Sequence, residues 1–344
     1  MTFITILIIV VFVVGYALIA LESATHINKA AVALLMCVAC WTLYMVHPAD
    51  YLPGVTTDLL SSRINTIIEE HLGSISTTLF FLMGAMTIVE VVDQYGGFNF
   101  VRDTLKTQSK RGLLWRVVAL TFILSAILDN MTTTIVMIMV LRKLVRDHSD
   151  RIIYASLIIL AANAGGAFSP IGDVTTIMLW NVGSITAAGV IEELLIPSAI
   201  SIFIPTLFLQ YKLHGALVEP DAATEETAAS VLSGWQHKAV FLLGVGGLIF
   251  VPIFRYLTDL PPFVGILLVL AVLWTVTELF FRLSKRAKTA GDMGKRVSQL
   301  LGRVDMSTIL FFLGILMTVA CLEEVGVLTV VGQGLDHTFH GNHY

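Results

Sequence analysis

The stretch Val117–Leu141, VVALTFILSAILDNMTTTIVMIMVL, places an Asp-Asn pair in the middle of an apolar segment with basic residues on both outer sides. The legs before and after Asp129 and Asn130 have 12 and 11 residues. At 1.5 Å per residue each leg reaches roughly 17 Å, about half of a hydrocarbon core of roughly 30 Å. A carboxylate at that depth is costly and rare unless it handles an ion or a proton. We therefore expect 117–141 to be a re-entrant hairpin with its tip near the membrane centre.

The composition is that of a membrane protein. The chain is 56% hydrophobic and 13% charged, with a mean hydropathy of +0.85, whereas soluble domains carry about 25% charge. Uncharged apolar runs recur along the chain at Thr2–Leu21, Ala30–Val46, Ser74–Val89, Val174–Val190, Leu194–Gln210, Ala239–Phe254, Leu260–Thr277 and Met306–Leu322. Each is long enough to span or nearly span a bilayer. We predict an all-α polytopic membrane protein surrounded by lipid. The net charge of −4 indicates that nucleic acid is not a partner.

Lysine and arginine are distributed unevenly among the connections. Segments 93–116, 142–151 and 282–303 hold five, four and seven of them, and Lys29, Lys212 and Lys238 add three. If 117–141 turns back and 152–181 is one broken span, 19 of the 21 basic residues lie on one side of the membrane. The positive-inside rule makes that side cytoplasmic. The pattern predicts a multi-pass protein of the cell inner membrane and independently favours the hairpin.

The sequence contains an internal repeat. Leu79–Phe98 aligns without gaps on Ile309–Leu328 at an offset of 230, and Trp41 and Trp274 end similar helices at a nearly equal offset. The connections around the two copies have opposite charge polarity, which predicts an inverted-repeat secondary transporter with broken helices at the midplane.

The repeat also divides the chain. We expect a first repeat with its N-terminal helix at 1–210, including hairpin 117–141 and broken helix 152–181, then a polar linker at 211–237. A partial second repeat follows at 238–344. The counterpart of Asp129 would be residue 359, beyond Tyr344, so we expect the second repeat to stop before its own hairpin and broken helix, as in a chain truncated at the C-terminus.

The hairpin tip offers ligands for a hard cation. Asp129 supplies an exchangeable charge, and Asn130, Thr132 and Thr133 supply neutral oxygens of the kind that hard cations prefer. A helix ending near Leu128 would add carbonyls with partial negative charge. The alternative is that Asp129 caps the second leg, with Thr132 in its first turn. Both roles are compatible.

A second polar segment interrupts the apolar run between Ala162 and Val174. Glycine and proline disfavour helix here, and unwound backbone inside a membrane is tolerated only where it is buried or lines a cavity. We expect an unwound segment at Asn163–Asp173, with Asn163 and Ser169 as ligands and Asp173 either as a ligand or as the cap of the helix that begins at Val174. The residues of the unwound backbone are Gly165, Gly166, Pro170 and Gly172, and further candidate ligands are Thr175 and Thr176.

These two motifs carry a resemblance. SAILDNMTTTIV (125–136) and NAGGAFSPIGDVTTIMLW (163–180) are similar to the two signature segments of NhaD-type sodium/proton antiporters, in the wider ion-transporter superfamily. The resemblance covers most of the chain. It implies a hairpin tip at Asp129 and Asn130, an unwound segment at 163–173 and a homodimer. It also implies a second Asp-Asn tip, which this sequence lacks.

The leading hypothesis is a sodium or lithium/proton antiporter in which cation and proton compete for Asp129, the residue expected to hold sodium. No cofactor is expected, and no phosphate-binding GxxxxGK[ST] motif is present. An anionic site argues against a carboxylate substrate. The alternative is a superfamily carrier of another substrate, such as arsenite or a metal–citrate complex. A remote alternative is an intramembrane aspartyl enzyme; we expect no enzyme activity.

Overall fold

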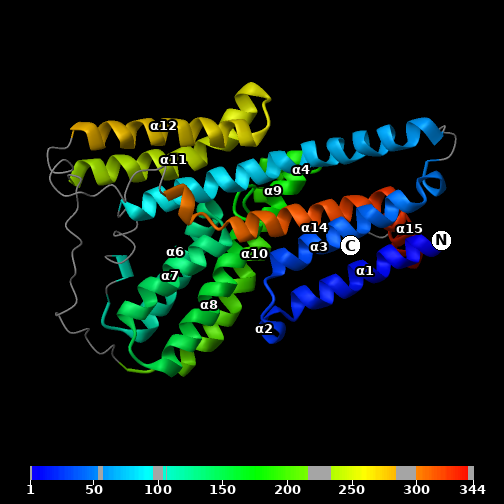
Figure 1. The fold of residues 1–344 in the computed structure, drawn as a ribbon. Helices are drawn as coiled ribbons and strands as arrows, with labels where there is room; N and C mark the ends of the chain where they lie inside the picture. The colour runs from blue at the N-terminus through cyan, green and yellow to red at the C-terminus, as the bar shows by residue number, and fades with distance from the viewer. Residues whose placement is uncertain are drawn as a thin grey trace. The chain divides into compact units, whose positions relative to one another are not determined.

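A computed structural model describes residues 2–52, 57–95, 104–105, 107–215, 234–283 and 300–339. The helices among them are α1 (Phe3–Ala20), α2 (Glu22–Thr25), α3 (Lys29–Val46), α4 (Thr57–Gln94), α6 (Lys110–Leu128), α7 (Asn130–Leu144), α8 (His148–Ala167), α9 (Val174–Val182), α10 (Ala187–Leu209), α11 (Gly234–Thr258), α12 (Pro262–Leu283), α14 (Met306–Glu324) and α15 (Val327–Phe339) (Figure 1). In this part of the chain eight helices are long and apolar enough to cross a membrane. The all-α polytopic class is confirmed.

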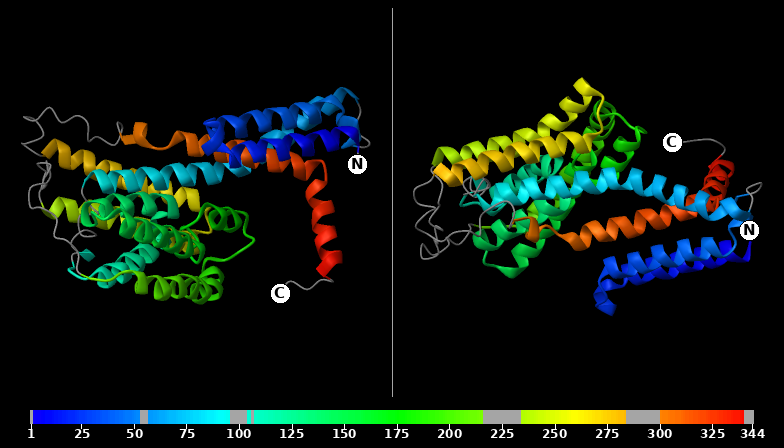
Figure 2. Two further views of the ribbon diagram at one scale, coloured as in Figure 1. Left: turned by 90° about the horizontal axis from the view of Figure 1, so that it is seen from below. Right: turned by 45° about the horizontal axis from the view of Figure 1, so that its top comes forward.

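The chain forms two compact units. The first comprises Met1–Phe80 and Asp305–Tyr344, and the second comprises Phe81–Val304, so that α4 contributes to both. In the first unit α3 packs between α1 and α14, and α1 and α3 lie side by side (Figures 1 and 2). In the second unit α6, α7 and α8 pack together, α10 covers α8, and α11 and α12 form an adjacent pair. Most of the expected linker, 216–233, lies outside the described residues.

In each unit, a helix of one expected repeat packs closely against a helix of the other repeat. A Cβ on Gly314 of α14 would lie 2.6 Å from the carbonyl carbon of Ala33 in α3, and one on Gly84 of α4 would lie 2.2 Å from Ile266 in α12. Gly84 and Gly314 are equivalent at the offset of 230, and Ala33 and Ile266 differ by 233, as the two tryptophans do. Each of the two close contacts therefore joins one helix of the first expected repeat to one helix of the second. The repeat organisation itself stays a prediction.

The segment around Asp129 folds as a hairpin. Lys110 Nζ lies 2.6 Å from Asp150 Oδ2, and the Tyr154 hydroxyl donates to the Lys110 carbonyl at 2.7 Å, so α6 begins beside the start of α8. Because α7 ends at Leu144 and α8 begins at His148, the end of α7 lies there too. Helices α6 and α7 are thus antiparallel. They are longer than the 12- and 11-residue legs expected, because helix continues through the flanking basic residues.

Two further hydrogen bonds show which ends of α9, α10 and α11 lie close to other helices in the second unit. Trp115 Nε1 donates to Gln210 Oε1 at 3.2 Å, which brings the end of α10 to the start of α6. Arg255 near the end of α11 donates to the Trp180 carbonyl in the last turn of α9 at 2.6 Å. The starts of α6 and α8 and the ends of α7 and α10 therefore share one end, the basic end. The ends of α9 and α11 lie together, and we expect them at the other end, because α9 follows the C-terminus of α8.

This arrangement predicts how introduced cysteines are labelled. In a background lacking the three native cysteines, cysteine at the exposed positions Arg146 and Lys212 should react with an impermeant maleimide from the same membrane side. Cysteine at Tyr256, which is 86% exposed, should react from the opposite side. Labelling of right-side-out and inside-out vesicles measures this. Reaction of positions 146 and 212 from opposite faces would contradict the hairpin topology.

Candidate functional site

The hairpin tip has an unusual backbone. Asp129 lies between α6 and α7 with φ 94° and ψ 155°, a region that residues other than glycine occupy at a cost of about 1–3 kcal/mol. Its Oδ1 accepts from the Thr132 amide at 2.8 Å, and its Oδ2 accepts from the Thr132 hydroxyl at 2.7 Å. Asp129 is therefore the N-cap of α7, as one of the two interpretations held. Only 8% of the Asp129 surface is exposed. An N-cap alone does not need a buried charge.

The broken helix differs in extent from the prediction. Helix α8 continues to Ala167, so the prediction that Gly165 and Gly166 are unwound is wrong for both. Helix is lost only at Phe168–Asp173, which includes Pro170 and Gly172. The reason is that proline disfavours helical backbone at the residue before it, so that the helix stops just short of Pro170. Asn163 is therefore held on a helix.

Glycines bring the hairpin and the broken helix into backbone contact. A Cβ on Gly165 would lie 2.2 Å from the Phe122 carbonyl oxygen, and one on Gly172 would lie 2.6 Å from the Ser125 carbonyl oxygen. The two glycines are thus required for close approach of α8 and the break to α6. Their role is packing rather than chain flexibility.

Two serine hydroxyls fasten the same contact. Ser125 donates to the Ala162 carbonyl, and Ser169 donates to the Ala126 carbonyl, both at 2.5 Å. The hydroxyl hydrogen of Ser169, which was predicted as a cation ligand, is thus used in a hydrogen bond to the backbone of α6. Ser125 was not among the predicted site residues, although it lies in the same motif. A serine within the apolar leg, four residues before Asp129, was the available signal.

One amide links the hairpin to both halves of the broken helix. Asn130 Nδ2 donates to Asn163 Oδ1 and to Asp173 Oδ2, each at 3.1 Å. The other oxygen of Asp173 accepts from the Thr175 amide and hydroxyl at 2.9 Å, which makes Asp173 the N-cap of α9. Both interpretations of Asp173 thus remain compatible. The result is a cluster of carboxylate and amide oxygens where three helix ends meet.

This arrangement, a hairpin tip and a broken helix with oxygen donors between them, can be compared with known proteins. The sequence pattern of the citrate-transporter family, CitMHS, matches residues 5–342. The chain belongs to this family. Its expected resemblance to NhaD-type antiporters is also confirmed, because the relatives described next include one. Family and relatives are transporters rather than enzymes.

Three relatives show where the chain stands within the family. It is 40% identical over 329 residues to Sodium/proton antiporter 1 of Arabidopsis thaliana, covering 94% of this chain and 54% of the relative. It is 38% identical to Sodium/proton antiporter 2 of the same plant, covering 74% of that protein. It is 28% identical to the Na(+)/H(+) antiporter NhaD of Alkalimonas amylolytica, covering 97% of this chain and 70% of the relative. The chain therefore spans about half of the first relative.

The remaining predicted ligands of this family member differ in how available they are. Thr133 is fully buried, and its hydroxyl has no hydrogen-bond partner among the described residues. Thr132 and Thr175 are engaged by the carboxylates that cap their helices. Thr176 is 8% exposed in the first turn of α9.

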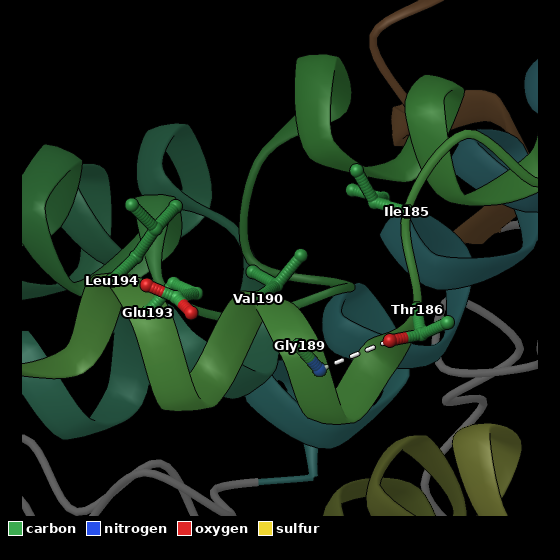
Figure 3. A pocket seen from close by; sticks show the side chains of 6 residues that line it. All are labelled: Ile185, Thr186, Gly189, Val190, Glu193 and Leu194. Atoms are coloured by element: carbon green, nitrogen blue, oxygen red, sulfur yellow. Dashed lines mark hydrogen bonds between the residues drawn. The ribbon is translucent and has the colours of Figure 1, made fainter. Parts of the chain in front are cut away.

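A separate hollow lies at the start of α10 (Figure 3). It is lined by Ile185, Thr186, Gly189, Val190, Glu193 and Leu194. The Thr186 hydroxyl accepts from the Gly189 amide at 3.1 Å, as an ordinary helix cap. None of the predicted ligands lines this hollow, so it is distinct from the oxygen cluster.

The close contact at Gly165 generates a stability prediction. Gly165→Ala should destabilise the protein by about 1–3 kcal/mol, because the added methyl group meets a backbone oxygen that side-chain rotation cannot move away. Thermal unfolding in detergent measures the loss. The matched control is Gly73→Ala in α4, where a Cβ meets nothing within 4 Å; it should leave the unfolding temperature unchanged or raise it slightly. Equal effects of the two substitutions would contradict the backbone contact.

Proposed function

We propose that the protein exchanges sodium or lithium for protons across the membrane by secondary active transport. The observation that carries the proposal is the buried carboxylate of Asp129 at the hairpin tip, beside the oxygen cluster of Asn130, Asn163 and Asp173. Hard cations prefer oxygen ligands of this kind. The names of the three relatives, all sodium/proton antiporters, agree with it.

The exchange rests on competition for Asp129. In the structure Thr132 donates its hydroxyl hydrogen to Asp129 Oδ2. When sodium arrives, rotation of that hydroxyl turns its oxygen lone pairs toward the ion, so that carboxylate and hydroxyl become ligands together. When a proton arrives instead, the carboxyl group donates to the same hydroxyl. One carboxylate cannot hold both, so binding one requires release of the other.

The charge of the cluster favours a cation over a carboxylate substrate. Among the described residues, the hydrogen-bond partners of the Asp129, Asn130 and Asp173 side chains are threonine, asparagine and aspartate groups, and none of these contacts involves a basic side chain. A citrate-like substrate would need cationic partners to offset its charge. A carrier of a metal–citrate complex is the second candidate, on the strength of the family's description alone. Arsenite as a substrate is implied only by the resemblance to the wider ion-transporter superfamily.

We also propose the setting in which this exchange occurs. The basic end, with Arg146 and Lys212, faces the cytoplasm of a cell whose inner membrane holds the protein, because positive residues are retained on that side. The protein works as a homodimer, as the resemblance to NhaD-type antiporters implies. Sodium and protons are then its transported species, and it carries no resident cofactor.

The decisive experiment measures sodium-driven proton movement in inside-out vesicles containing the protein expressed from its complete reading frame. Asp129→Asn should abolish exchange, because it removes the titratable charge while retaining an N-cap. Asp173→Asn should retain exchange but raise the half-saturating sodium concentration about tenfold, because a charged ligand is replaced by a neutral one.

The chain offers a matched control for replacing an aspartate N-cap by asparagine. Asp305 caps α14 through Thr308 just as Asp129 caps α7 through Thr132: the Thr308 amide donates to one carboxylate oxygen at 3.2 Å and its hydroxyl to the other at 2.5 Å. Asp305 is exposed, however. Asp305→Asn should therefore leave exchange unchanged. Exchange that persists in Asp129→Asn would refute the assignment, and proton movement driven by metal–citrate instead of sodium would favour the second candidate.

A further inference from the structure

Arg255 stands out in the charge pattern. It is one of two basic residues assigned to the side of the membrane opposite the basic end, the other being Arg63. It is half-buried near the end of α11. Its guanidinium carbon lies 4.7 Å from the centre of the Trp180 ring, and its Nη1 donates to the Trp180 carbonyl at 2.6 Å. One side chain thus contacts both the ring and the backbone of the same residue.

This contact lies at the C-terminus of α9. The Trp180 carbonyl also accepts from Gly183, whose φ of 81° ends the helix. The last carbonyls of a helix carry partial negative charge, and a cation placed there is stabilised. In the described part of the chain Arg255 forms no ion pair with a carboxylate. Its guanidinium group therefore contacts the C-terminus of α9 and the face of the Trp180 ring.

Helix α9 connects this contact to the oxygen cluster. It has nine residues, so at 1.5 Å per residue its two ends lie about 14 Å apart. At the other end Asp173 caps the helix and accepts from Asn130. The non-helical segment Phe168–Asp173 separates α9 from α8, so α8 does not fix its position by continuous helix. The Arg255 contact supplies a fixed point from α11.

We propose that Arg255 is a positioning residue for cation binding. By holding the C-terminus of α9 through Trp180, it sets where Asp173 lies relative to Asn130 and Asn163. The inference rests on the proposed exchange activity and deepens it, because it adds a determinant of sodium affinity that does not touch the ion.

The first test is the sodium dependence of exchange in vesicles. Arg255→Gln should raise the half-saturating sodium concentration about tenfold, with a much smaller change in maximal rate, because a charge-assisted hydrogen bond and a cation–π contact are lost. Arg255→Lys should raise it about threefold, because lysine keeps the charge but not the planar fork that bonds and stacks at once. Trp180→Phe should lie near the lysine variant. The control is Arg63→Gln, an exposed arginine of α4, which should have no effect.

The second test does not depend on transport. A cysteine at the exposed position Thr175, in the first turn of α9, should react with a hydrophilic thiol reagent at a rate that changes at least severalfold when Arg255→Gln is added, and not when Arg63→Gln is added. Cys37, Cys40 and Cys321 are replaced beforehand. Where the glutamine variant expresses poorly, Arg255→Lys takes its place in both assays.

The outcomes separate the two proposals. Unchanged sodium dependence and unchanged labelling in the Arg255 variants, or equal changes in the Arg63 control, would overturn the positioning role. Absence of sodium-driven exchange in the unmodified protein would overturn the proposed function, while the labelling rates would still decide whether Arg255 fixes α9.

Discussion

Satisfaction of backbone polar groups is the constraint on which the rest of this structure depends. Where helices end inside a membrane, their free amides and carbonyls find no water, and each one left unpaired costs several kcal/mol. Where α6, α7, α8 and α9 meet, side chains form the hydrogen bonds that these backbone groups need. Asp129 and Asp173 cap the two helix starts, and the hydroxyls of Ser125 and Ser169 donate to carbonyls of neighbouring segments.

The same solution produces the candidate binding site. Carboxylates that cap helices present negative charge and free lone pairs to the space between the helix ends, and the Asn130 amide holds the hairpin and the two half-helices at one spacing. In the proposed exchange mechanism, the atoms that satisfy the helix ends are also the atoms that bind the ion. The close glycine contacts make this possible, because any larger residue at Gly165 or Gly172 would separate the backbones that these side chains join.

The exchange of helices between the expected repeats explains why spatial units and sequence repeats differ. Helix α3 packs on α14, and α4 meets α12 at the equivalent glycine. A chain divided at the linker would separate each of these pairs. Close glycine packing of this kind is a common way for helices to associate where lipid removes the hydrophobic driving force. The long-range contact at Trp41, whose ring nitrogen donates to the Met317 carbonyl at 2.9 Å, adds a buried hydrogen bond to the first of these pairs.

The sequence by itself determined the membrane class, the positions of most spans, the turn at Asp129 and the family, because hydropathy, charge asymmetry and two specific motifs are local signals. It also placed the break near Pro170, but it extended the break to Gly165 and Gly166, because glycine in a helix looks like a breaker until its packing partner is known. Only the tertiary structure decided that these glycines face the backbone of α6, that Ser169 is bound to Ala126, and that Asn130 joins Asn163 to Asp173. Those facts depend on contacts between residues tens of positions apart, and the physical reason they escape sequence reasoning is that a glycine, serine or asparagine has no fixed role until a neighbouring helix supplies the atom it meets.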